Sequence, residues 1–125
     1  MSAMTSSATT RTREARGIAG TYARIVHEIC RVLSAREVAE AVGVGERTVQ
    51  NWRAGTTQPR GGAREALLDL HFVVDALSDV YTEEGVEVVL RGRAKTLNDR
   101  RPLEVFASGD RETVVRLAGQ LRDYG

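Results

Sequence analysis

The sequence is poor in the residues that mark disulfide-rich, fibrous and membrane proteins. Cys30 is the single cysteine among 125 residues, so no disulfide can form within one chain, and a reducing, cytoplasmic compartment is expected. Two prolines and 12 glycines are too few for a collagen-like or low-complexity chain. Asp69, Asp75 and Asp79 interrupt the most hydrophobic segment, so neither a membrane-spanning helix nor a membrane partner is expected. No apolar run follows the arginines of residues 1–16, so no signal peptide is expected either.

Residues that could build an active site are scarce as well. The chain is too short for most barrel and doubly wound enzyme scaffolds. Its two histidines and one cysteine do not supply a nucleophile, a base and an orienting group, and it contains no glycine-rich phosphate loop or G-x-S-x-G motif. His27 and Cys30 lie three residues apart but no second pair of ligands exists, and His71 is expected in the core or at an interface. No metal, cofactor or enzymatic activity is therefore expected, and a small helical enzyme is the alternative from another functional class.

Charge is divided unevenly between the two halves of the chain. The formal net charge is +1, and 17 of the 18 basic residues are arginine. Residues 1–62 contain nine arginines and five glutamates, whereas residues 63–125 contain nine basic and 12 acidic residues. The first half is therefore suited to a polyanion such as nucleic acid, and the second half is not.

The spacing of apolar residues predicts a mostly helical chain. Residues 1–16 are rich in Ser, Thr and Arg and are expected to form a disordered arm. Helices are predicted over about 18–33, 35–42, 45–53 and 63–81, with a last one around 114–121. Residues 83–91 are predicted as a helix, although three valines in four residues also suit a strand. The apolar face of the helix at 63–81 is so wide that it must be covered on more than one side, by both halves of the chain or by a second copy.

Local signals define the ends of the short helices. The tetrapeptide Ser34-Ala35-Arg36-Glu37 matches a capping box, in which Ser34 and Glu37 each bond a free backbone amide of the other. Gly43 can take the left-handed conformation that ends a helix. Gly55 and the loop around Pro59 end the next helix.

The most informative motif combines a small residue, a glycine and five apolar positions. It is Val38-Ala39-x-x-Val42-Gly43-Val44-x-x-x-x-Val49-x-x-Trp52. Two helices packed at a tight turn need a small residue where they cross, a glycine in the turn and a shared apolar wedge. The motif predicts a helix-turn-helix and resembles the Xre-like repressors, whose recognition helix commonly ends in a tryptophan followed by a loop with Gly and Pro. A plain helical hairpin is the alternative.

A helix-turn-helix would place a set of polar residues on the exposed face of its second helix. Arg47 and Asn51 lie almost opposite Val49 and Trp52, and Gln50 flanks them. Arginine pairs with guanine, and asparagine or glutamine pairs with adenine, so these three are candidates to contact bases. The candidates for contacts with phosphates are Thr48, Arg53 and Arg60, together with the arginines of the N-terminal arm. An ordinary solvated helix face is the alternative.

A second motif lies near the C-terminus. The segment Leu97-Asn98-Asp99-Arg100-Arg101-Pro102-Leu103-Glu104-Val105-Phe106-Ala107-Ser108-Gly109-Asp110 is followed by a helix with Val114 and Val115, and the chain ends in Tyr124-Gly125. It resembles the toxin-binding domain of the Xre/MbcA/ParS antitoxins, and the resemblance covers about residues 18–125. Many members of that family carry an apolar or aromatic residue and a longer spacer where this chain has the charged run Asn98–Arg101.

This resemblance implies a type II antitoxin that dimerises, neutralises a RES-type toxin that degrades NAD, and represses its own operon. Pro102 fixes a turn, and Leu103, Val105 and Phe106 offer an apolar anchor cluster. The residues assigned to toxin binding are Pro102, Leu103, Phe106, Leu117, Leu121 and Tyr124. A purely structural role, in which these residues cover the long helix, is the alternative.

The predicted architecture is all-α. It has a disordered arm (1–16), a helix-turn-helix domain (17–62), linking or dimerisation helices (63–91) and a toxin-binding domain (92–125). The predicted partners are the cognate RES-type toxin, operator DNA and a second copy of the chain. A stand-alone, dimeric Xre-like repressor is the alternative function.

Overall fold

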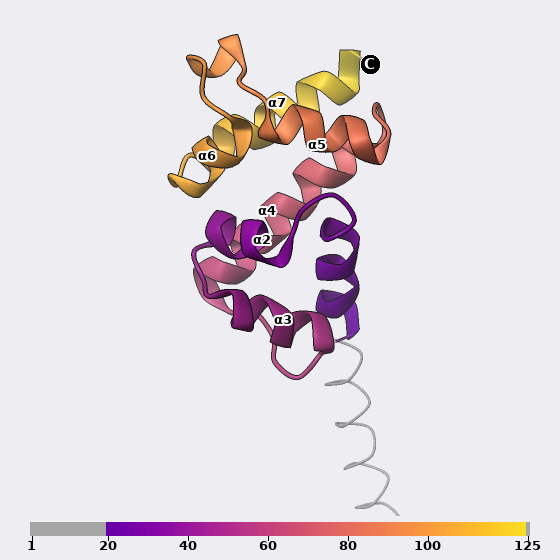
Figure 1. Ribbon diagram of the computed structural model, residues 1–125, viewed down its shortest axis with the longest axis vertical. Helices are drawn as coiled ribbons and strands as arrows, with labels where there is room; N and C mark the ends of the chain where they lie inside the picture. Colours follow the sequence, from indigo (N-terminus) through magenta and orange to yellow (C-terminus); the bar gives the residue numbers. More distant parts are fainter. Residues whose placement is uncertain (1–19, 125) are drawn as a thin grey trace, which may run out of the picture.

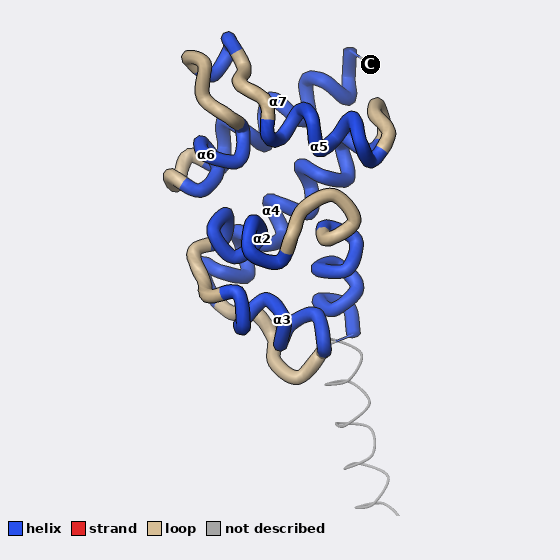
Figure 2. Tube along the Cα trace, viewed as in Figure 1, coloured by secondary structure: helices blue, strands red, loops and turns tan. Residues whose placement is uncertain are grey.

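The computed structural model describes residues 20–124, and the predicted arm at 1–16 lies outside them (Figure 1). A first helix covers residues 20–29. It is followed by α2 (Ala35–Val42), α3 (Glu46–Ala54), α4 (Gly61–Ser78), α5 (Glu83–Arg91), a 3-10 turn η1 (Lys95–Leu97), α6 (Pro102–Ala107) and α7 (Arg111–Tyr124). Residues 20–124 form no strand, and short loops join the helices (Figure 2). The prediction of an all-α fold is confirmed.

Helix α2 begins and ends at the predicted residues. The Glu37 amide donates to Ser34 Oγ (3.1 Å), and the Ser34 amide donates to Glu37 Oε1 (2.9 Å), so the capping box is complete. Gly43 ends the helix with a φ of 79°, in the left-handed region that glycine adopts without steric cost. Both ends of α2 are therefore set by its local sequence.

The strand alternative for residues 83–91 is wrong, because this segment is the helix α5. The Gly85 amide donates to the hydroxyl oxygen of Thr82 (3.1 Å), which caps the helix at its N-terminus. Val86 is buried and Val89 half-buried, whereas Val88 is 68% exposed. A helix can bury only two of these three valines, since each residue turns by about 100° from the one before it.

Two helices end earlier than predicted. The first helix ends at residue 29, because residues 30–33 form a turn in which the Val32 amide donates to the Ile29 carbonyl. This turn buries the adjacent pair Val32 and Leu33 together, which a continuing helix would place about 100° apart. Helix α4 ends at Ser78, so Tyr81 lies in the turn that leads to α5.

Helix α4 is the element on which both halves of the chain pack. In Figure 1 it runs from the group formed by the first helix, α2 and α3 to the group formed by α5, α6 and α7. It contacts α2, α5 and α7. Its buried residues are Ala66, Leu67, Leu70, Val73, Val74, Ala76 and Leu77. They belong to one continuous core, so the wide apolar face predicted for this helix is covered within a single chain. None of the helices in the described part is long and apolar enough to cross a bilayer.

Three polar contacts join helices that are distant in sequence. Arg91 at the end of α5 donates to both carboxylate oxygens of Glu37 on α2, at 2.7 and 2.8 Å. Arg111 on α7 donates to Asp69 on α4 at 3.0 Å. His71 on α4 lies 2.6 Å from Glu28 on the first helix. Glu37 therefore both caps α2 and holds α5 against it.

We expect Glu37→Gln to flatten the dependence of stability on acidic pH. The hydrogen bond from Arg91 is the main cause that lowers the pKa of Glu37 from 4.5 to about 2. A lowered folded-state pKa means that this carboxylate contributes stability above about pH 4.5 and loses it as the pH falls toward about 2. The midpoint of urea unfolding, measured at pH 7, 4 and 2.5, should therefore decrease less with falling pH in the variant than in the unaltered chain.

Glu40→Gln is the matched control, since Glu40 pairs only with the largely exposed Arg36 on the same helix. Equal pH profiles for the Glu37 and Glu40 variants would show that the bond to Arg91 contributes nothing measurable.

Candidate nucleic-acid and partner-binding surfaces

The first candidate surface is built on the α2–α3 pair. The wedge between these helices buries Val38, Val42, Val49 and Trp52, and Trp52 is only 3% exposed. Gly43 makes the turn, and the next amide, of Val44, donates to the Ala39 carbonyl at 3.0 Å. These contacts fix α3 in position, so its opposite face points away from the core.

The six residues predicted to contact DNA lie on α3 and in the loop after it. Arg47, Gln50 and Arg53 are exposed, and Thr48 and Asn51 are half-buried. Arg60 is exposed and directly precedes α4. Structure and sequence therefore agree on which face of α3 is accessible.

The arginines on and beside α3 have no acidic partner among residues 20–124. Within the described residues, no ion pair includes Arg47, Arg53 or Arg60, whereas Glu37 and Glu40 of α2 are paired with Arg91 and Arg36. Three arginine charges thus remain available to an external anion. Glu46 in the first turn of α3 is the acidic residue of this helix.

The second candidate surface lies on α6 and α7. Tyr124 is 90% exposed, and Leu103, Leu117 and Leu121 are half-buried at the surface. Leu117 and Leu121 lie beside Val89 of α5 and Pro102 of α6 around a shallow apolar depression. Leu103 lies apart from them, in a separate depression that Glu37, Glu40 and Ala41 of α2 also line.

Two of the six residues assigned to toxin binding are not accessible. Pro102 and Phe106 are buried in the chain's own core, together with Val105. Helix α6 has only six residues, three of them buried, and it packs against α2, α5 and α7. Sequence reasoning could not separate a core anchor from a binding anchor, because both are apolar residues at helical spacing.

Sequence reasoning also missed two exposed apolar residues, Val88 on α5 and Leu68 on α4. The three closely spaced valines of α5 were the available signal, because a helix cannot bury all of them. For Leu68 the signal was helical spacing, because Leu67, Leu70 and Leu77 share the buried face of α4 and Leu68 lies about 100° from Leu67.

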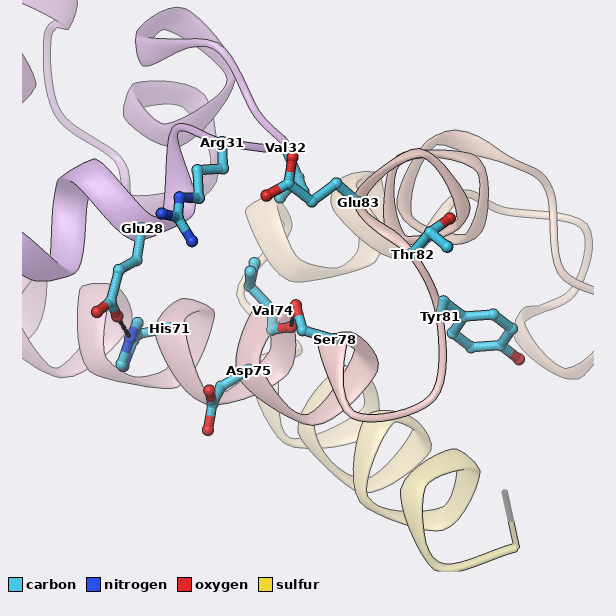
Figure 3. A pocket seen from close by; sticks show the side chains of 10 residues that line it. All are labelled: Glu28, Arg31, Val32, His71, Val74, Asp75, Ser78, Tyr81, Thr82 and Glu83. Atoms are coloured by element: carbon cyan, nitrogen blue, oxygen red, sulfur yellow. Dashed lines mark hydrogen bonds and ion pairs between the residues drawn. The ribbon is translucent and has the colours of Figure 1, made fainter.

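A polar cleft of about 480 Å³ lies where the first helix, α4 and the start of α5 meet (Figure 3). The hydrogen bond from His71 is the main cause that lowers the pKa of Glu28. The hydroxyl of Ser78 donates to the Val74 carbonyl (2.7 Å), and that of Thr82 caps α5. These groups are already engaged in structural bonds, so we assign no chemistry to the cleft. Its lining residues are Glu28, Arg31, Val32, His71, Val74, Asp75, Ser78, Tyr81, Thr82 and Glu83.

Cys30 and the histidines do not form a metal site. Cys30 is half-buried and free, and burial raises its pKa, while Arg53 acts in the opposite direction. His27 is exposed. Within residues 20–124 no three His, Cys, Asp or Glu side chains are grouped to hold a metal ion.

Comparison with known proteins finds antitoxins. No family model matches the chain. The chain is 34% identical over 84 residues to a probable mycobacterial cidal antitoxin of Mycobacterium tuberculosis. The aligned region covers 67% of this chain and 70% of the relative. It is 28% identical over 85 residues to the mycobacterial cidal antitoxin MbcA of the same organism, over 68% of this chain and 75% of MbcA.

A solved structure agrees with these relatives. The fold matches a chain in the crystal structure of the M. tuberculosis MbcT–MbcA toxin–antitoxin complex with a TM-score of 0.69 and 25% identity. The match covers 81% of this chain and 93% of the other. The relatives carry the names of antitoxins, in agreement with the prediction that this chain is not an enzyme.

We expect Trp52→Ala to lower the free energy of unfolding by about 3–5 kcal/mol, because it leaves a cavity in the wedge between α2 and α3. Arg47→Ala is the matched control on the same helix, and it should leave stability within about 0.5 kcal/mol because its side chain is exposed. Urea denaturation followed by circular dichroism measures both. A strongly destabilised Arg47 variant would contradict the exposure of this face.

Proposed function

The chain belongs to the family of mycobacterial cidal antitoxins, and we propose that it neutralises a cognate toxin in the cytoplasm by binding to it directly. The observation that carries this proposal is the match of 81% of the chain to a chain of the MbcT–MbcA complex, together with its 34% identity to a relative of the same class. Neutralisation by binding needs a folded partner surface and no catalytic group, which suits a chain with one cysteine and two histidines.

The proposed toxin surface is the accessible part of α6 and α7. It consists of Leu103, Leu117, Leu121 and Tyr124, which we call the toxin-binding surface. An exposed tyrosine is a typical interface anchor, because it buries a large apolar area on binding and its hydroxyl can still form a hydrogen bond. Buried Pro102 and Phe106 would act on binding only indirectly, by holding Leu103 in place.

The proposed toxin is a RES-type enzyme that degrades NAD. This finer assignment rests on the segment 97–110 and on its resemblance to the toxin-binding domain of the Xre/MbcA/ParS antitoxins. The division of the chain into a DNA-binding part (17–62), linking helices (63–91) and a toxin-binding part (92–125) is proposed with it. In the described residues the three parts share one core, so we propose functional regions and not independently folding units.

We further propose that the α2–α3 pair is a helix-turn-helix of the Xre-like class, through which a homodimer binds operator DNA and represses its own operon. Support comes from the buried wedge around Trp52 and from the three arginines without acidic partners on or beside α3. A dimer of such domains would contact two half-sites about one helical turn apart.

A stand-alone dimeric repressor is the second candidate function. It is favoured by the position of the proposed DNA contacts, which lie on α3 and in the loop after it and not on α6 or α7. The two functions differ in whether the neighbouring gene product binds the chain.

We expect the unaltered chain to restore growth to cells in which the adjacent open reading frame is induced, and to co-purify with its product. Tyr124→Ala should weaken the complex by about 2 kcal/mol, about 30-fold in Kd, because it removes an exposed aromatic anchor without disturbing the core. Val88→Ala, at an exposed apolar residue outside the toxin-binding surface, is the control and should bind normally. A harmless neighbour that does not co-purify would leave the repressor as the better description.

We expect Arg47→Ala to reduce affinity for the upstream region of the operon by at least about tenfold at a fixed salt concentration. The reason is the loss of a base or phosphate contact from the exposed face of α3. Gel-shift titration measures it, and Arg36→Ala on the exposed side of α2 is the control. Unchanged affinity of the Arg47 variant would remove this residue from the proposed DNA contact.

A further inference from the structure

A second concentration of positive charge lies in the loop between α5 and α6, residues 92–101, which we call the basic loop. It contains Arg93, Lys95, Arg100 and Arg101 and one acidic residue, Asp99. The rest of the C-terminal half, residues 63–91 and 102–125, carries 11 acidic and five basic residues. The basic loop is therefore a short positively charged segment between two acidic segments of the chain.

Most of this charge is not neutralised by ion pairs in the described part of the chain. Arg101 pairs with Glu104. Arg93 and Arg100 donate to the backbone carbonyls of Asp99 (3.4 Å) and Leu97 (3.3 Å). Within residues 20–124, no carboxylate is paired with Arg93, Arg100 or Lys95. All three are exposed, so their charges are available to a partner.

The basic loop has a defined shape. The side chain of Leu97 is buried, and the Ala94 amide donates to the Arg100 carbonyl at 3.1 Å. The Asp99 amide donates to the Ala94 carbonyl at 3.0 Å. Asn98 and Asp99 are both left-handed, with φ of 57° and 61°, and these residue types tolerate that conformation better than most. The cations are thus held on a preorganised backbone, which lowers the entropy lost on binding.

The surroundings of the basic loop favour an acidic protein surface over nucleic acid. Figure 1 shows the loop at the opposite end of the molecule from α3, so one duplex lying along α3 would not reach it. The segments on either side of the loop, residues 63–91 and 102–125, carry an excess of acidic residues, which disfavours a long polyanion. A protein with a local acidic patch would meet only the loop, and the loop leads directly into α6, which carries Leu103 of the toxin-binding surface.

We propose that the basic loop docks on an acidic patch of the cognate toxin and accelerates the association of the two proteins. This inference rests on the proposed antitoxin function. Exposed charges at the edge of an interface act mainly on the association rate, because they attract the partner before contact, and salt screens this attraction. The apolar residues of α6 and α7 then determine how slowly the complex dissociates.

The test compares Arg93→Glu/Lys95→Glu with Arg24→Glu/Arg36→Glu, an equal change of net charge on exposed residues of the first helix and α2. Binding to the immobilised product of the adjacent open reading frame is followed over a salt series. The loop variant should associate about tenfold or more slowly at low salt, with a nearly unchanged dissociation rate. The difference in association rate between the loop variant and the unaltered chain should shrink as the salt concentration rises. The control should associate nearly as fast as the unaltered chain. Arg93→Gln/Lys95→Gln should associate at a rate between those of the charge-reversed loop variant and the unaltered chain.

Three results would overturn the proposal. Equal association rates for the loop variant and the unaltered chain would remove the loop from the contact while leaving the antitoxin function intact. A loop variant that binds toxin normally but loses affinity for operator DNA would identify nucleic acid as the partner of the loop. Failure of the unaltered chain to bind the toxin would overturn the antitoxin function and this inference together. Circular dichroism and operator binding of the loop variant, both expected to be unchanged, verify that it is folded.

Discussion

The burial of α4 on two sides is the constraint on which the rest of this structure depends. Leu67, Leu70 and Leu77 are fully or almost fully buried, and each contributes about 1.5–3 kcal/mol relative to an exposed side chain. The N-terminal helices cover one part of α4, and α5 and α7 cover the rest. Since each half would expose apolar surface without this helix, the two halves form one core. Functional regions proposed at opposite ends of the molecule are therefore parts of a single folded unit.

Glu37 shows how one side chain can serve local and tertiary structure together. It completes the capping box of α2 and receives both hydrogen bonds of a bidentate contact from Arg91 at the end of α5. The second contact is the main cause that lowers the pKa of Glu37 to about 2, so the carboxylate stays charged in acidic solution where an ordinary glutamate is protonated. The helix pair that carries the proposed DNA-binding face is thereby held to the half that carries the proposed toxin surface.

The distribution of ion pairs separates structural charges from available ones. In the described residues, Glu28, Glu37, Asp69 and Glu104 are each paired with a basic side chain, whereas two groups of exposed arginine and lysine side chains form no ion pair. One group lies on and beside α3, and the other lies in the basic loop. Figure 1 places these groups at opposite ends of the molecule, which is consistent with two different partners.

Local signals in the sequence determined the all-α class, the capped helix α2, its glycine stop and the start of α5, because each depends on residues within about four positions. The wedge around Trp52 and the exposed face of α3 also followed from helical spacing. Only the tertiary structure decided that the first helix stops at residue 29, that Val88 faces solvent, and that Pro102 and Phe106 belong to the core. Burial depends on which distant segments cover a residue, and the spacing of apolar residues along the chain does not specify those segments.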